Sequence, residues 1–154
     1  MAATSAAPTL KARAVGYLSR REHSRVELER KLAPHAGSTA ELHQLLDELA
    51  EQGWQCDQRF AHSLLNRRLA RYGWQRLAHE LRQHGITDTI IASLRDGVQT
   101  TEAERAQAVW EKRFGQPADS PKEYARQYRF MMSRGFAPEL IRRLLGDLPP
   151  PAAP

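Results

Sequence analysis

The sequence predicts an all-α protein built from three tandem three-helix repeats. Apolar residues recur at helical spacing along the chain, and no segment shows the alternating apolar and polar pattern of a strand. At four expected helix starts, a Ser or Thr is followed three residues later by Glu, which is the spacing of a helix capping box. Similar segments also return at offsets of 45 to 50 residues, as expected of an internally repeated protein.

The first four expected helices each have a local reason to begin or end. Arg20 and Arg21 close the first helix, where cations complement the negative end of the helix dipole. Ser24 and Ser38, each with a Glu three positions later, open the second and third helices. Asp57 is placed to cap the fourth.

Glycine, proline and two further caps bound the later helices. Gly73, Gly85 and Gly97 fall between periodic segments, where a helix stops or turns. Thr101 and Ser120, each with a Glu three positions later, open the seventh and eighth helices. Prolines at the first helical position favour the starts of the eighth and ninth. The nine expected helices span 9–21, 24–33, 39–52, 57–71, 74–84, 87–96, 101–114, 121–134 and 137–146.

The helices group in threes because the same short patterns return in the same order. First helices end with two apolar residues, one polar residue and two cations. Second helices share a small residue followed by Leu at the fifth and ninth positions. Third helices share a Gly, a large apolar residue, an apolar pair and a last Leu. The matching segments are 17–21, 64–68 and 109–113 for the first helices, 24–32 and 73–81 for the second, and 85–94 and 135–144 for the third.

This grouping predicts the organisation of the whole chain. Repeats are expected at 9–56, 57–98 and 99–147, with disordered extensions at 1–8 and 148–154. If the repeats stack with similar orientation, the paired cations that end each first helix form a row along one side. These cations are Arg20 and Arg21, Arg67 and Arg68, and Lys112 and Arg113.

Composition favours an anionic partner in a reducing compartment. Among 154 residues, 23 Lys and Arg stand against 18 Asp and Glu, and only four of the cations are Lys. An Arg-rich excess suits a nucleic acid or an acidic protein surface and does not choose between them. Cys56 is alone, so no internal disulfide is expected. No signal peptide and no apolar run of roughly 20 residues is found, so we expect a cytoplasmic protein without a membrane span.

Several motifs together resemble the RecX family, bacterial regulators of the RecA recombinase. The early motif L-x-R-R-E-H-S-x-x-E-L is followed by D-x-R-F-A and then by Y-G-x-x-R-L-x-x-E-L-R-Q-x-G-I. Gln55 and Cys56 depart from the apolar or acidic residues that this family usually has before Asp57. The resemblance covers roughly 10–146, with its motifs at 17–32, 57–61 and 72–86 and the third-repeat segments at 112–116 and 133–145.

The resemblance implies a fold and a function that composition and spacing alone do not give. It implies an elongated, curved molecule of tandem three-helix repeats. It also implies binding within the groove of the RecA–single-stranded DNA filament, with inhibition of filament growth, strand exchange and co-protease activity. DNA repair, recombination and the SOS response would then be modulated. Whether the protein touches single-stranded DNA directly stays open, and a monomer is expected.

The middle repeat is the most cationic and supplies the main candidate site. Residues 58–100 hold seven Arg against three acidic residues, whereas 1–57 hold one more acid than base. Guanidinium groups bind carboxylates and phosphates through paired hydrogen bonds, and Tyr72 and Trp74 could add contact area or stack on a base. Solvated helix faces and a core Trp74 are the alternative. The candidate residues are Arg67, Arg68, Arg71, Arg76 and Arg82, with Arg20, Arg21 and Arg25 as a second group.

The remaining residues favour structure over chemistry. The third cation group is interpreted as a solvated face: Arg126, Arg129, Arg134, Arg142 and Arg143. Six His and one Cys show no metal-ligand spacing, and no phosphate loop or acid–base pair is recognisable, so neither catalysis nor a cofactor is expected. Large side chains at helical spacing are assigned to the core, namely Trp54, Trp110, Phe114, Tyr124, Tyr128 and Met131.

The alternative function is direct DNA binding of helix-turn-helix type. In this reading the segment 71–75 is a turn that leads into a recognition helix. Salt distinguishes the two, because phosphate contacts release counterions and direct DNA binding therefore weakens steeply as salt rises. A helical-repeat scaffold for another protein predicts neither RecA inhibition nor salt-sensitive DNA binding.

Overall fold

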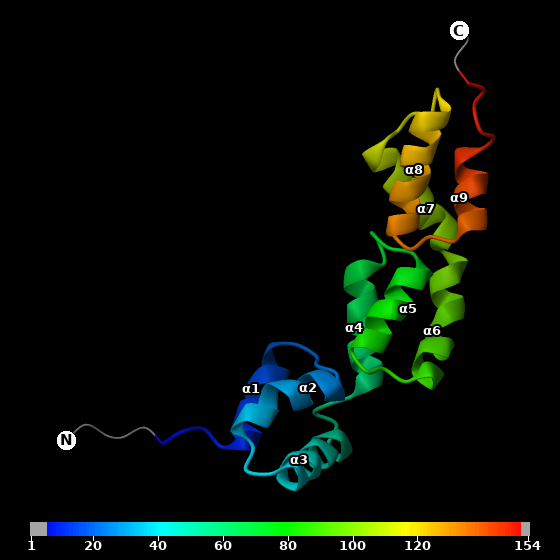
Figure 1. Ribbon diagram of the computed structural model, residues 1–154. Coiled ribbons are helices and arrows are strands. Elements are labelled where there is room, and N and C mark those ends of the chain that lie inside the picture. The colour runs from blue at the N-terminus through cyan, green and yellow to red at the C-terminus, as the bar shows by residue number, and fades with distance from the viewer. Residues whose placement is uncertain (1–5, 152–154) are drawn as a thin grey trace. The chain divides into compact units, whose positions relative to one another are not determined.

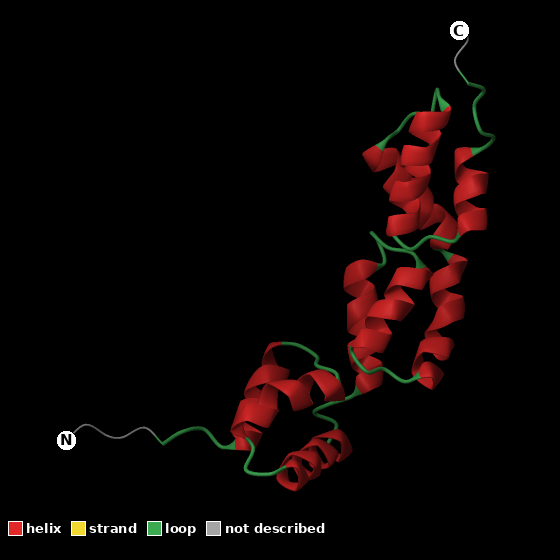
Figure 2. Ribbon diagram, viewed as in Figure 1, coloured by secondary structure: helices red, strands yellow, loops and turns green. Residues whose placement is uncertain are grey.

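The computed structural model describes residues 6–151, and these residues form nine α-helices and no strand (Figures 1 and 2). Of the extensions at 1–8 and 148–154 that were predicted to be disordered, residues 1–5 and 152–154 lie outside the described residues. Three trios of helices follow one another along the chain. They are α1 (Leu10–Arg20), α2 (Arg25–Leu32) and α3 (Thr39–Glu51), then α4 (Asp57–Arg68), α5 (Trp74–Gln83) and α6 (Asp88–Thr100), then α7 (Glu102–Arg113), α8 (Pro121–Ser133) and α9 (Pro138–Leu145), with a short 3₁₀ turn η1 (Ala33–His35) before α3.

The helix starts at serine form as the capping-box spacing predicts. The hydroxyls of Ser24, Ser38 and Ser120 each accept the backbone N–H of the Glu three positions on, at 3.1 Å. Each hydroxyl therefore satisfies one of the amide groups that a helix leaves without an internal partner. The carboxylate of Glu27 does not return to Ser24, because it pairs with Arg21 instead.

Two of the predicted boundaries are wrong, and both concern the passage from α6 to α7. Gly97 lies inside α6, which continues to Thr100. Thr101 is then the single residue between two helices, and its backbone is not extended (φ −103°, ψ 3°), so its side chain does not cap α7. Its hydroxyl instead donates to the carbonyl of Val98 and accepts from Nε of Arg105.

The described residues divide into two compact units. Unit 1 comprises 6–63 and 84–86, and unit 2 comprises 64–83 and 87–151. Unit 1 buries a leucine-rich core between the helices of the first trio, because the apolar faces of α2 and α3 turn toward α1. Its buried members are Ala14, Leu28, Leu32, Leu42, Leu45, Leu46 and Leu49.

Unit 2 contains the core of the last trio. Met131, Phe136 and Ile141 are fully buried there, and Trp110 packs against them. The indole N–H of Trp110 donates to the side-chain oxygen of Gln127 at 2.9 Å, so the polar end of the ring is satisfied. The core assignment of Met131 and Trp110 is confirmed. Trp54, in contrast, is 45% exposed in unit 1, and its assignment to the core is wrong.

One hydrogen bond recurs where consecutive trios meet. In unit 1, the Asp57 carboxylate accepts the backbone N–H of Arg25 at 2.8 Å. In unit 2, the Glu102 carboxylate accepts the backbone N–H of Trp74 at 2.6 Å. Asp57 and Glu102 are the first residues of α4 and α7, while Arg25 and Trp74 are the first residues of α2 and α5. The acid that begins one trio thus caps the second helix of the trio before it.

Glycines allow the close approach at the same places. Gly135 has φ +85°, and a Cβ there would collide with the Cβ of Arg76 in unit 2. Backbone bonds fix the approach: the N–H of Gly73 donates to the carbonyl of Arg134 at 2.8 Å, and that of Gln75 donates to Gly135 at 3.2 Å. Gly85 has φ +75° and meets Val26 in the same way within unit 1. Only glycine combines this backbone conformation with this contact.

A half-buried arginine completes the joint in unit 2. The guanidinium of Arg105 donates to the carbonyls of Leu69, Tyr72 and Val98 at 2.7 to 2.9 Å. It therefore ties the segment between α4 and α5 to the end of α6. Burial lowers the pKa of Arg105 from its ordinary value, against the opposing charge of Glu102, and the group remains a cation at neutral pH.

No helix in residues 6–151 is both long enough and apolar enough to cross a membrane.

Candidate basic surface

The eight arginines predicted to bind a partner fall into two groups, one in each unit. Arg20, Arg21 and Arg25 lie in unit 1, at the end of α1 and the start of α2. The other five, Arg67, Arg68, Arg71, Arg76 and Arg82, lie in unit 2, on α4, α5 and the segment between them.

In unit 1, two of the three arginines are engaged by neighbouring acids. The guanidinium of Arg21 donates two hydrogen bonds to the carboxylate of Glu27, at 3.1 and 2.5 Å. This hydrogen bond raises the pKa of Arg21. Burial alone would raise the pKa of Glu27, but Arg21 holds it below its ordinary value. Arg25 pairs with Asp47 at 2.7 Å, so this group forms an internal ion-pair network more than an open cationic patch.

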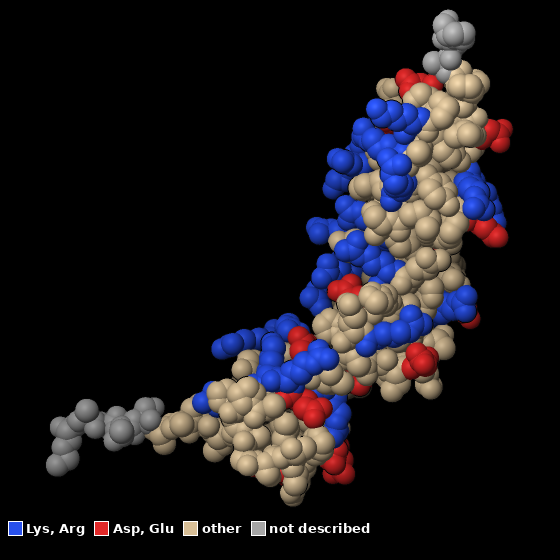
Figure 3. All heavy atoms as spheres, in the orientation of Figure 1, with Lys and Arg blue, Asp and Glu red and all other residues tan. Residues whose placement is uncertain are grey.

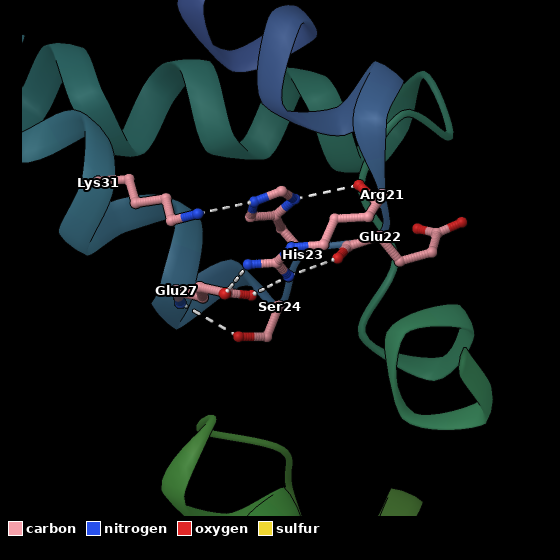
Figure 4. A network of polar contacts seen from close by, with 6 residues as sticks. All are labelled: Arg21, Glu22, His23, Ser24, Glu27 and Lys31. Carbon is pink, nitrogen blue, oxygen red and sulfur yellow. Dashed lines mark hydrogen bonds and ion pairs between the residues drawn. The ribbon is translucent and has the colours of Figure 1, made fainter. Parts of the chain in front are cut away.

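A buried histidine lies at the centre of that network (Figure 4). Nδ1 of His23 is 3.0 Å from the carbonyl of Arg21, and Nε2 is 3.1 Å from Nζ of Lys31. A neutral ring that donates from Nδ1 and accepts at Nε2 satisfies both contacts. Burial lowers the pKa of His23, which favours this neutral form. The carboxylate of Glu22 points away from the network in Figure 4 and accepts from Arg59 at 3.0 Å.

In unit 2, guanidinium groups and aromatic rings alternate in what we call the arginine ladder. At one end, the guanidinium carbons of Arg68, Arg76 and Arg134 lie 5.8, 4.1 and 5.4 Å from the centre of the Tyr72 ring. Arg134 also lies 5.0 Å from the centre of the Phe130 ring. A cation within about 6 Å of a ring centre is attracted by the ring quadrupole, so these side chains are held in place.

The ladder continues across α7 and α8. Arg113 lies 5.3 Å from the centre of Phe130 and 5.9 Å from that of Phe114, and Arg126 lies 5.5 Å from Phe114. The two phenylalanine rings meet edge to face at 5.3 Å. The whole ladder comprises Arg68, Arg76, Arg113, Arg126 and Arg134 with Tyr72, Phe114 and Phe130.

An open hollow of about 570 Å³ adjoins the ladder and shares three of its residues. Its lining consists of apolar residues, which we call its floor, and of cations, which we call its rim, with no acidic residue among those that line it in the described part of the chain. In Figure 3, basic side chains gather along the left-hand edge of unit 2, beside α4, α7 and α8. The lining residues are Ala70 and Arg71 after α4, Ala108, Val109, Lys112 and Arg113 of α7, and Phe130 and Arg134 at the end of α8.

Not every cation of unit 2 is equally available. Arg68 pairs with Glu80 at 3.3 Å, and Arg82 pairs with Asp88 at 3.6 Å. Arg76 donates to the carbonyl of Ser133 at 3.0 Å. Within residues 6–151, Arg113 and Arg134 have no carboxylate within ion-pair distance. Their guanidinium groups are therefore the cations of the ladder with most capacity to bind another molecule.

The sequence predicted only some of the arginines that form this surface. It placed Arg68, Arg71 and Arg76 in the candidate site, but it interpreted Arg134 and Arg126 as a solvated face. The structure brings the two sets together because the loop of Gly135 docks on Gly73, which places Arg134 over Tyr72. One signal was present in the sequence, since Lys112 and Arg113 occupy the joint that Arg67 and Arg68 occupy in the preceding trio.

The side chains of this surface are chemically suited to binding anions. Guanidinium groups only donate hydrogen bonds and stay charged, so they can hold carboxylates or phosphates but cannot accept a proton from a substrate. Among residues 6–151, no three His, Cys, Asp or Glu side chains are grouped so that they could hold a metal ion.

Comparison with known families matches most of the second and third trios. Residues 57–93 match the family described as "RecX, second three-helix domain". Residues 100–145 match "RecX, third three-helix domain".

Comparison with individual proteins extends over nearly the whole chain. The chain is 50% identical over 137 residues to a protein of Ralstonia pickettii strain 12J named "Regulatory protein RecX", covering 89% of this chain and 86% of that one. It is 46% identical over 138 residues to the "Regulatory protein RecX" of Chromobacterium violaceum, covering 89% of each. The crystal structure of RecX from Lactobacillus salivarius has the same fold, with a TM-score of 0.73 at 19% identity over 88% of this chain and 92% of that one.

Proposed function

The chain belongs to the RecX family, and from this premise we propose that it is a non-catalytic regulator of the RecA–single-stranded DNA filament. It binds the filament and inhibits the recombinase, both in ATP hydrolysis and in strand exchange, and it inhibits the co-protease activity. Through these effects it modulates DNA repair and the SOS response. It acts in the cytoplasm as a monomer without a cofactor.

The arginine ladder and its hollow are the observation that supports this proposal. A nucleoprotein filament presents phosphates and acidic side chains, and both are ligands of guanidinium groups. Because Arg113 and Arg134 are held against aromatic rings, little side-chain freedom remains to be lost when they bind. A surface of this kind can engage adjacent parts of a filament and oppose the movements or additions that recombination requires.

Hydrolysis of ATP by RecA in the presence of single-stranded DNA tests the proposal directly. The chain is added over a range from well below to equal amounts with RecA, and the rate of hydrolysis is followed. We expect inhibition at or below equal amounts. An unchanged rate throughout this range contradicts the proposed function.

The alternative of direct helix-turn-helix DNA binding is less well supported by the geometry. A recognition helix must present its first turn to the groove. Here Trp74 at the start of α5 is buried, its N–H is bonded to Glu102, and Gly73 packs on the backbone of Gly135. Duplex DNA binding in the absence of RecA that is tight and steeply weakened by salt would restore this alternative.

A further inference from the structure

The hollow beside the ladder combines two features that a simple phosphate-binding surface does not need. Arg71, Lys112, Arg113 and Arg134 surround it. Its floor is formed by small or aliphatic side chains, with the edge of the ladder at Phe130. A ligand that fits both features carries negative charges on either side of an apolar group.

The aromatic rings of the ladder are already occupied. Each of Tyr72, Phe114 and Phe130 has at least two guanidinium groups within 6 Å of its ring centre. A nucleic-acid base stacks on an open ring face, so a base at this surface would have to displace a guanidinium. The apolar area that remains open is the aliphatic floor of the hollow, and it suits an aliphatic side chain better than a base.

We infer that the hollow receives an acidic peptide segment with an aliphatic side chain. The aliphatic group lies on Ala108 and Val109, and the neighbouring carboxylates pair with Arg113, Arg134 and the other cations of the rim. The inference rests on the proposed function and deepens it, because it assigns this part of the surface to a protein partner and not to the phosphates of DNA. The volume of about 570 Å³ accommodates a few side chains.

Helix α7 offers a matched pair of variants for the test. Ala103 and Ala108 are both exposed on this helix, but only Ala108 lines the hollow. Ala108→Gln fills the floor with a neutral polar side chain of good helix propensity, and Ala103→Gln makes the same change outside it. Arg113→Gln removes a rim cation, and Arg142→Gln removes an exposed cation of α9 that does not line the hollow.

Binding is measured by fluorescence anisotropy at low salt with three labelled probes. The first is a ten-residue peptide of Asp and Glu with one central Leu, the second has Asn in place of the Leu, and the third is a deoxythymidine oligonucleotide of equal charge. We expect the Leu peptide to bind about tenfold more tightly than the Asn peptide. Ala108→Gln should abolish that advantage while Ala103→Gln preserves it, and Arg113→Gln should weaken both peptides more than Arg142→Gln does.

Two results overturn the inference. One is equal affinity of the wild-type protein for the two peptides. The other is tighter binding of the oligonucleotide that depends on Arg113 and is unaffected by Ala108→Gln, since the surface would then be a phosphate site. Hydrolysis of ATP by RecA is measured with the same preparations. If the wild-type protein inhibits it while the peptides bind equally, the inference fails and the proposed function stands. If it does not inhibit, the proposed function fails whatever the peptides do.

Discussion

The carboxylate of Glu102 lies 2.6 Å from the backbone nitrogen of Trp74 and accepts its hydrogen bond. Glu102 begins one helix and Trp74 begins another that lies two helices earlier in the chain. Both residues are buried, so the interaction is sheltered from water. The bond thus joins neighbouring trios by the same chemistry that caps a single helix.

Glu102→Gln should destabilise the protein, because a neutral amide replaces the charge that faces the start of α5. We expect a loss of about 1 to 2 kcal/mol in the free energy of unfolding, measured by urea denaturation. Glu104→Gln is the control, since Glu104 is exposed in the same turn of α7 and should change stability by less than about 0.5 kcal/mol. Equal effects of the two substitutions would show that the charge of Glu102 contributes nothing to this capping contact.

Gly135→Ala should be more damaging than the same change at Gly146, another glycine with positive φ. Gly135 and Gly146 have φ +85° and +74°, but only at Gly135 would a Cβ meet other atoms, those of Arg76. We expect Gly146→Ala to cost about 1 to 3 kcal/mol through backbone strain and Gly135→Ala to cost about 2 kcal/mol more, because the added Cβ must also displace Arg76. Thermal or urea unfolding measures both. Similar losses for the two variants would contradict the close docking of this loop.

The double variant Arg113→Gln, Arg134→Gln should weaken inhibition of RecA, because it removes the two ladder cations that line the hollow, neither of which pairs with an acid among residues 6–151. We expect the concentration needed for half-inhibition of ATP hydrolysis to rise roughly tenfold or more. The matched control is Arg142→Gln, Arg143→Gln, which removes two exposed cations of α9 and the same total charge. Far-ultraviolet circular dichroism and melting temperature should change little in either protein. Loss of inhibition in the control alone would move the binding surface to α9.

The stability of the protein should depend on pH through His23. Burial lowers the pKa of His23 in the folded state below its ordinary value of 6.5, so the unfolded chain takes up the proton first as pH falls. The contribution of this residue to stability is therefore complete above about pH 6.5 and declines as pH falls from there toward the lower, folded pKa. The cations of Arg21 and Lys31 face the ring and oppose its protonation, while Glu27 favours it.

Urea denaturation at pH 7.5 and pH 5.5 measures this dependence. The wild-type protein should lose more stability between these two values than His23→Gln does, because the variant has no group to titrate at this position. Equal losses in the two proteins would show that His23 is not responsible. The carboxyl of Glu27 does not contribute to the difference between pH 7.5 and pH 5.5, because its pKa lies below its ordinary value of 4.5 and therefore outside this range.

Local signals predicted the helices well because each depends on only a few neighbouring residues. Ser24, Ser38 and Ser120 cap their helices as expected, and the expected and observed helix bounds differ by only a few residues. The exceptions have tertiary causes. Gly97 has open space around it, and α6 continues through it because Leu94 and Val98 on either side are buried. The cost of glycine inside a helix is about 1 kcal/mol, which such packing outweighs.

The candidate surface was only half predictable because it is made by docking. The excess of arginine in the middle of the chain pointed to Arg68, Arg71 and Arg76, and these residues do lie at the ladder or its hollow. Arg134 is 58 residues beyond Arg76 in the sequence, and only the contact between Gly73 and Gly135 brings the two to the same tyrosine ring. The assignment of Trp54 to the core was wrong because helical spacing cannot reveal which apolar residue the other helices leave uncovered.

The capping contact between trios also limits how far such an array can grow. Arg25 and Trp74 donate their amide hydrogens as the first residues of α2 and α5, but the first residue of α8 is Pro121, which has no amide hydrogen to give. At the opposite end, α1 begins with Leu10 and carries no acid in its first turn that could accept such a bond. A further module, or a second molecule added head to tail, would therefore find neither the amide donor nor the carboxylate acceptor of this hydrogen bond.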